Sequence, residues 1–105
     1  GWSSSTGEAD WGLRPLFAGD KTPPSMYNIS YYKNPTVDAD IMKALGTTDR
    51  AEKTKLYTEV QEEIWKDAPW AFLVTEKLLY ATSKKLTGMY VMPDANYFFE
   101  EIDLQ

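Results

Sequence analysis

Apolar side chains recur every three or four residues in the middle of the chain, a spacing that is typical of amphipathic helices. The first such stretch is predicted to begin with Asn34 as the N-cap and Pro35 at the first helical position. Gly46 is predicted to end it. The apolar positions of this helix are Val37, Ile41, Met42 and Leu45.

A second helix is predicted to start at Asp49 and to end before Pro69. Asp49 and Glu52 have the spacing of a capping box. The apolar positions are Leu56, Tyr57, Val60, Ile64 and Trp65, and we predict that Trp65 and Trp70 both lie in the core. Because the connection between the two helices is short, they are predicted to form a helical hairpin.

The segment before the hairpin is predicted to contain a short helix followed by a long loop. Residues 10–17 can form a helix of one or two turns with Asp10 as its N-cap, which Gly12 and Pro15 limit in length. Residues 18–35 are rich in residues that favour turns and carry three tyrosines, so they are predicted to be a loop. Loops of this length are often functional or packed against another part of a larger protein.

After Pro69 the pattern changes from helical to extended. The almost continuous apolar run 70–74 predicts a buried strand, and residues 78–81 a second extended piece. A turn is predicted at 84–88, and short strands at 90–92 and 97–99. The predicted fold class is therefore α+β (α/β), with a helical hairpin plus short strands.

Composition narrows the possible functions. The chain has 105 residues, 43% of them hydrophobic and 26% charged, which fits one globular domain without a segment long enough to cross a membrane. The net charge of −5 argues against nucleic acid as a partner. Because the chain lacks cysteine and histidine, it has no thiolate nucleophile and no Ser-His-Asp triad, and we expect no structural zinc, other metal or cofactor.

The first residues of the chain have the composition of a binding loop. The indole of Trp2 offers a flat apolar wall, and the run Ser3, Ser4, Ser5 and Thr6 offers hydroxyls and backbone N–H groups to a polar ligand. The alternative is that Trp2 simply packs at the end of an element. The abrupt start, with no initiator Met and no leader, favours a chain that begins in the middle of a fold.

Other polar groups have simpler interpretations. Glu8 and Asp10 could form a catalytic carboxylate pair, although helix capping explains Asp10 without it. Five charged residues of the second helix are predicted to form its solvated face, with Lys55 and Glu59 spaced for an ion pair, namely Lys53, Lys55, Glu59, Glu62 and Glu63.

A resemblance to a known family emerges from the order and spacing of several motifs. The chain combines Gly1-Trp2, the helix start 34–38, Leu56-Tyr57 and the run 64–70. In this it resembles the C-terminal segment of the family 5 solute-binding proteins, the peptide and nickel receptors of ABC importers. The motifs at 7–11, 76–77, 83–84, 86–88 and 92–94 resemble those of the glutathione-binding subgroup. The resemblance covers essentially the whole chain.

The resemblance implies a two-lobed periplasmic binding protein fold that closes on its ligand about a hinge. Residues 1–75 would belong to the second lobe, and residues 76–105 would cross the hinge and return to the first lobe. In the dipeptide and oligopeptide receptors, the Trp matching Trp2 lines the ligand site, and an Asp three residues later pairs with the ligand's amino group. Here that position is Ser5, which cannot form an ion pair and favours the glutathione-binding subgroup.

Two main functional hypotheses follow. The first is a non-enzymatic receptor fragment that binds a small peptide, glutathione by resemblance, through Trp2, Ser3, Ser4, Ser5 and Thr6, and delivers it to a membrane permease. Its location would be the periplasm or, in a Gram-positive organism, the extracellular side of the cell membrane, held there by an anchor. The second is an independent α+β module whose loop tyrosines bind a protein partner, and a hydrolase using Glu8 and Asp10 is a third. We also expect the fragment to self-associate through strand edges that it leaves open.

Overall fold

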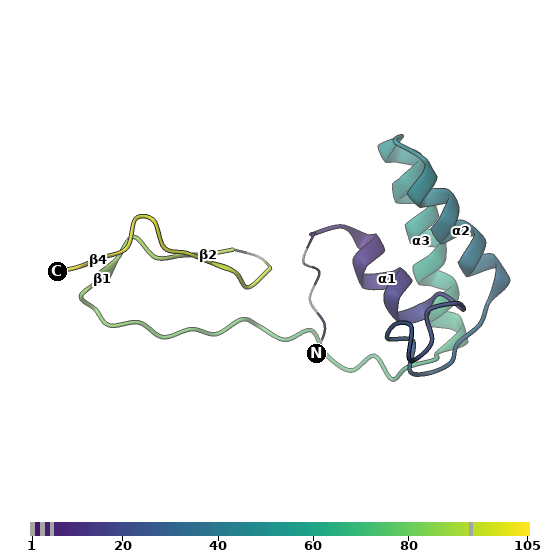
Figure 1. Ribbon diagram of the computed structural model, residues 1–105, viewed down its shortest axis with the longest axis horizontal. Helices are drawn as coiled ribbons and strands as arrows, with labels where there is room; N and C mark the ends of the chain where they lie inside the picture. Colours follow the sequence, from purple (N-terminus) through teal and green to yellow (C-terminus); the bar gives the residue numbers. More distant parts are fainter. Residues whose placement is uncertain (1, 3, 5, 93) are drawn as a thin grey trace. The chain divides into compact units, whose positions relative to one another are not determined.

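The computed structural model describes residues 2, 4, 6–92 and 94–105. It divides into two compact units, Trp2–Phe72 and Leu73–Gln105, which are described separately (Figure 1). The first unit contains the helices α1 (Ala9–Phe17), α2 (Pro35–Gly46) and α3 (Arg50–Asp67). Among its described residues the second contains four two-residue strands, so the α+β class is confirmed.

The helices α2 and α3 pack side by side as a hairpin joined by residues 47–49, as predicted (Figure 1). The end of α1 and one face of each hairpin helix bury the main core, which consists of Leu16, Phe17, Ala18, Val37, Ile41, Val60 and Ile64. A smaller cluster of Ala44, Leu56 and Tyr57 lies further along the hairpin, and Leu13 of α1 packs against both. The first unit therefore has its own hydrophobic core.

Both predicted hairpin caps are present. The Asn34 side chain accepts hydrogen bonds from the backbone N–H groups of Thr36 and Val37, and Asp49 accepts from those of Ala51 and Glu52. The other hydrogen bond of the predicted capping box, from the Asp49 N–H to the Glu52 side chain, is absent, so this part of the prediction is wrong. The Asp49 N–H donates to the Thr47 hydroxyl, which in turn donates to Glu52 at 3.0 Å. Thr47 therefore takes the place that the capping box would give to Glu52.

The predicted N-cap role of Asp10 is also wrong. Helix α1 begins one residue earlier, and Glu8 occupies the N-cap position without a side-chain hydrogen bond. Asp10 lies inside the helix, where its carboxylate accepts three hydrogen bonds from Arg14 at 2.8–3.1 Å. The four-residue spacing places the two side chains on one helix face, so the ion pair replaces the expected cap.

The helical periodicity predicted most of the buried residues but not all of them. Met42 is 64% exposed and Leu45 is also exposed, whereas the smaller Ala44 is fully buried. Trp65, predicted to lie in the core, is 68% exposed. Trp70 is half-buried and packs against the core, with its ring 4.8 Å from that of Phe17. On the solvated face of α3, the predicted ion pair between Lys55 and Glu59 is confirmed at 3.8 Å.

The loop between α1 and α2 is organised around one buried amide. Asn28 is fully buried, and its Nδ2 donates to the backbone carbonyls of Ala18 and Tyr32 at 3.0 and 2.9 Å. Its Oδ1 accepts from the Ser30 hydroxyl and from the Tyr32 N–H. Because the side chain satisfies these backbone groups, the loop can pack on the helices without regular structure.

A second contact fastens the loop to the end of α3. The Tyr32 hydroxyl donates to Asp67 Oδ2 at 2.6 Å, and Asn34 Nδ2 donates to the same oxygen at 2.9 Å. The pKa of Tyr32 is raised to about 12, mainly because its phenol is partly buried and also because it donates a hydrogen bond to Asp67. The same hydrogen bonds lower the pKa of Asp67. One carboxylate thus connects the start of α2 with the end of α3.

The second unit begins as an extended, exposed segment. The strand predicted at 70–74 is wrong, because residues 71–83 have no regular structure and make no strand ladder. Leu73, Val74 and Leu79 are each more than 80% exposed. A continuous apolar run is consistent with a buried strand, but no neighbouring strand in the described part of the chain covers this one.

Two small antiparallel pairs complete the second unit. Strand β2 (Tyr90–Val91) pairs with β3 (Tyr97–Phe98), which confirms the strands predicted there. Strand β1 (Leu86–Thr87), predicted as part of a turn, pairs with β4 (Asp103–Leu104), for which no strand was predicted. None of the helices in the described ranges is long and apolar enough to span a membrane.

Candidate functional site

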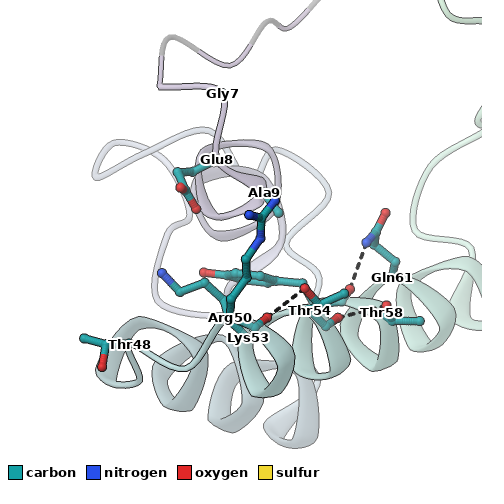
Figure 2. Close-up of a pocket in the computed structure, with 10 residues that line it drawn as sticks. Gly7, Glu8, Ala9, Thr48, Arg50, Lys53, Thr54, Thr58 and Gln61 are labelled. Carbon is teal, nitrogen blue, oxygen red and sulfur yellow. Dashed lines mark hydrogen bonds between the residues drawn. The ribbon is translucent and has the colours of Figure 1, made fainter.

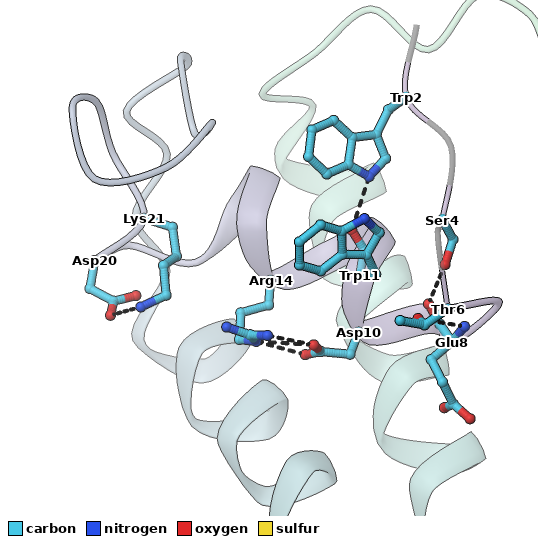
Figure 3. Close-up of polar contacts among 9 residues, drawn as sticks. All are labelled: Trp2, Ser4, Thr6, Glu8, Asp10, Trp11, Arg14, Asp20 and Lys21. Atoms are coloured by element: carbon cyan, nitrogen blue, oxygen red, sulfur yellow. Dashed lines mark hydrogen bonds and ion pairs between the residues drawn. The ribbon is translucent and has the colours of Figure 1, made fainter.

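Trp2 lies in an aromatic cluster at the start of the first unit. Its indole Nε1 donates to the backbone carbonyl of Trp11 at 2.9 Å (Figure 3). Its ring lies 6.0 Å from that of Trp11 and 5.1 Å from that of Tyr27. The side chain is nevertheless 39% exposed. The cluster therefore holds the indole in place and leaves part of its surface available for contact.

The loop that follows Trp2 is held by its own polar groups. The Ser4 hydroxyl donates to the carbonyl of Glu8, and the Thr6 hydroxyl accepts from the N–H of Glu8, both at 3.2 Å (Figure 3). Gly7 has a φ of +70°, a conformation in which glycine is favoured. Thr6 therefore keeps its hydroxyl hydrogen as a donor, and Ser4 keeps its oxygen as an acceptor.

Of the predicted ligand-binding residues, the structure describes Trp2, Ser4 and Thr6. Ser3 and Ser5 lie outside the described residues. The three described side chains lie on one short segment that leads into α1 (Figure 3). Their role in ligand binding stays a prediction.

The carboxylates near this loop have different surroundings. Asp10 is engaged with Arg14, and their hydrogen bond raises the pKa of the Arg14 guanidinium. Glu8 is exposed. The ion pair gives Asp10 a structural role in α1, whereas Glu8 makes no comparable contact within the described ranges. No cluster of three potential metal ligands occurs among the residues that the structure describes.

A polar groove of about 680 Å³ lies between residues 7–9 and one face of α3 (Figure 2). Two rows of residues at four-residue spacing form the α3 wall, namely Arg50, Thr54 and Thr58, and Lys53, Tyr57 and Gln61. Glu8 lies on the opposite side. The volume is in the range of small-molecule sites.

Hydrogen bonds along α3 decide which polar atoms remain free in this groove. The hydroxyl of Thr54 donates to the carbonyl of Arg50, and that of Thr58 donates to the carbonyl of Thr54 (Figure 2). Gln61 Nε2 donates to the carbonyl of Tyr57 at 2.9 Å. The two hydroxyl oxygens and Gln61 Oε1 therefore remain as acceptors.

The groove is more basic than the chain as a whole. Arg50 and Lys53 line it, and neither makes an ion pair with any residue in the described ranges. Tyr57 is buried, which raises its pKa, and the negative charges of Asp10 and Glu8 raise it further. The Glu8 carboxylate thus acts on the Tyr57 phenol, and the two cations face the same space.

The sequence interpretation missed this groove. Of its α3 residues, Lys53 was assigned to the solvated face of the helix and Tyr57 to the apolar stripe, and the others were given no role. The available signal was the polar repeat at positions 50, 54 and 58, beside 53, 57 and 61. The facing residues 7–9 could not be placed against it without the tertiary structure.

An apolar pocket of about 360 Å³ lies elsewhere in the first unit, between α1 and the end of α3. The rings of Trp65 and Phe72 stack at its edge, 5.5 Å apart. It offers little polar chemistry, because Gln61 is the one polar side chain besides the Trp65 and Trp70 indoles among its lining residues.

The comparison with known proteins gives close relatives along the whole chain, although no family model matches it. The chain is 61% identical over 104 residues, 99% of its length, to the glutathione-binding protein GsiB of Pectobacterium atrosepticum. It is 53% identical over all 105 residues to proteins of the same name from Salmonella typhimurium and Escherichia coli K12. Each match covers 20% of the relative, so the chain spans about a fifth of the length of these proteins. The predicted resemblance to the glutathione-binding group is confirmed.

Proposed function

Because the chain is homologous from end to end to a part of the glutathione-binding solute-binding proteins, we propose that it forms one part of a receptor that captures glutathione for an ABC importer. The observation that carries this proposal is the identity of 53–61% over the whole chain. The activity proposed is binding without catalysis. Its partners are a small peptide ligand and the membrane permease that receives it.

The same homology supports a proposal about architecture. We propose that residues 1–75 belong to the second lobe of a two-lobed receptor and that residues 76–105 cross the hinge to the first lobe. The exposed apolar side chains of residues 72–80 support this, since a segment that runs between lobes is covered by the rest of the protein. The proposed location is the periplasm or, in a Gram-positive organism, the extracellular side of the cell membrane, held there by an anchor.

Within this receptor, the loop at the start of the chain is the proposed contact with ligand. The partly exposed indole of Trp2 is fixed by Trp11 and Tyr27, so it can form a wall of the site with little loss of side-chain freedom. The free hydroxyl hydrogen of Thr6 can donate to a ligand carbonyl or carboxylate. Ser5 is neutral, so this position offers no negative charge to pair with the amino group of a peptide ligand.

The test is calorimetric titration of the full receptor that contains this segment, stripped of ligand, with reduced glutathione and with a plain dipeptide. We expect tight binding of glutathione and weak binding of the dipeptide. Trp2→Ala should weaken glutathione binding by about tenfold or more, because it removes most of an aromatic contact surface.

Trp65→Ala is the matched control, since it removes an exposed tryptophan that is not part of the loop. We expect it to leave the affinity for glutathione within about twofold. If the Trp2→Ala receptor binds glutathione as tightly as the wild type, Trp2 does not contact the ligand. If the wild-type receptor binds neither ligand, the assignment to glutathione fails and other solutes must be tried.

A second candidate, a module that binds a protein through its loop tyrosines, has a specific observation in its favour. Tyr27 and Tyr31 are 54% and 63% exposed. Tyr31 also has a positive φ of 54°, which is uncommon for an aromatic residue. Retention of a protein partner by the chain, and its loss in the Tyr31→Ser variant, would favour this candidate.

A further inference from the structure

The groove beside α3 has the chemistry of a site for a peptide-like anion. Its cations, Arg50 and Lys53, lie in the first turn of α3, and the neutral acceptors of Thr54, Thr58 and Gln61 follow along the helix. The charged end and the neutral end are therefore separated along one axis.

The length of the groove fits a short peptide. Arg50 and Gln61 are eleven positions apart in α3, which at about 1.5 Å per residue is a span of about 16 Å. An extended tripeptide spans about 10 Å. A ligand of this size is shorter than the whole groove, but it can reach from Lys53 to Thr58, which are five positions or about 8 Å apart along the helix.

The two cations are available for a ligand. Arg14, Lys43 and Lys66 each pair with a carboxylate of the first unit, whereas Arg50 and Lys53 make no ion pair within the described part of the chain. The backbone N–H groups of Ala51 and Glu52 are already bound by the Asp49 side chain. An anion at this end of the groove would thus be held by the guanidinium and the ammonium, not by the helix N-terminus.

Glu8 provides the complementary charge on the facing wall. It lies on the segment that continues from the Trp2 loop, so the groove adjoins the proposed contact with ligand. Two cations against one carboxylate match a ligand with more carboxylates than ammonium groups.

We propose that this groove binds one carboxylate end of a small acidic peptide, with Arg50 and Lys53 holding that carboxylate and the acceptors of Thr54, Thr58 and Gln61 facing its amide N–H groups. This assignment rests on the proposed function, because it takes the peptide ligand of that receptor as the occupant. It adds residues of α3 to a site that the sequence placed in the first loop alone.

The test is NMR titration of the ¹⁵N-labelled chain with three probes. Reduced glutathione carries both carboxylates, glutarate is a dicarboxylate without a peptide backbone, and the glutathione diester has lost both negative charges. We expect glutathione and glutarate to shift the backbone amides of Arg50, Lys53 and Thr54. The diester should leave these amides unmoved.

Variants then separate charge from shape. The double variant Arg50→Gln with Lys53→Gln should weaken glutathione binding by about tenfold or more, and the charge-conserving pair Arg50→Lys with Lys53→Arg should retain most of it. Lys55→Gln is the matched control, since Lys55 is on the same helix but does not line the groove. Because these side chains are at the surface, an unchanged spectrum away from the groove will show that each variant is folded.

Each outcome decides a separate point. If the double variant binds glutathione as tightly as the wild type, or if only amides of the first loop shift, the groove assignment is overturned and glutathione binding stands. If glutarate shifts the α3 amides and glutathione shifts none in the chain, the groove is an anion site and the proposed ligand is wrong. If no probe shifts these amides, the groove assignment is overturned.

Discussion

At the scale of single residues, the most demanding environment belongs to Asn28. Its amide is fully buried and makes two hydrogen bonds as donor and two as acceptor. Neither Asp nor Leu, of similar size, could do this, because the site needs both donors and acceptors. One side chain thereby replaces the regular hydrogen bonds that the loop lacks.

Replacing this amide should destabilise the first unit. Asn28→Ala leaves the Tyr32 carbonyl and N–H without their partner and takes one of two donors from the Ala18 carbonyl, so we expect a loss of about 2–4 kcal/mol in the free energy of unfolding. Urea denaturation followed by circular dichroism measures it. The neighbouring and exposed Ile29 supplies the control, since Ile29→Ala should cost about 0.5 kcal/mol or less. Similar costs for the two variants would contradict the role assigned to Asn28.

At the scale of elements, the ends of the hairpin helices followed from local signals. Asn34 and Asp49 cap the helices as predicted, because capping depends on residues within one turn of the chain. The face of a helix that is buried depends on its neighbours, and this is why Trp65 was assigned to the core and Ala44 was not. The strand predicted at 70–74 failed for the same reason, since strand pairing needs a distant partner.

In the candidate site, too, the sequence predicted what depends on neighbouring residues and missed what depends on tertiary packing. Its loop could be proposed from sequence, because Trp2 and its hydroxyl neighbours are consecutive. Its groove could not, because residues 7–9 and the α3 residues 50–61 are far apart in the chain and meet only when α1 packs on α3.

Two adjacent residues of α3 test the assignment of its buried face. Ile64 is 3% exposed, so Ile64→Ala should lower the free energy of unfolding by about 2–5 kcal/mol. Trp65 is 68% exposed, and its main aromatic contact is Phe72, so Trp65→Ala should cost about 1 kcal/mol or less. Denaturation of both variants under the same conditions provides the comparison. A larger loss for Trp65→Ala would mean that this tryptophan is buried in solution.

At the scale of the whole molecule, the two units differ in how many of their backbone N–H and C=O groups form hydrogen bonds. The helices of the first unit enclose a core, whereas residues 73–82 make no backbone hydrogen bond to any residue in the described ranges. We expect the amides of residues 73–82 to exchange with deuterium at nearly the rate of an unfolded chain, and those of Val60 and Ile64 to be the slowest. Exchange followed by NMR measures this. Strong protection of residues 73–82 in the isolated chain would contradict this, because it would show that their backbone forms hydrogen bonds that the structure lacks. The expected self-association of the chain stays a prediction, which sedimentation can test.

The burial of Asn28 also restricts how the chain can be produced. Asn28 is followed by Ile29 and Ser30, which together form an acceptor pattern for N-linked glycans. The atom that would carry the sugar is Nδ2, the same atom that donates to the Ala18 and Tyr32 carbonyls in the interior. A glycan has no room there, because the residue is fully buried. In a eukaryotic secretory pathway, any chain glycosylated at Asn28 during synthesis would be unable to close its loop, so a bacterial host is the appropriate source of folded protein.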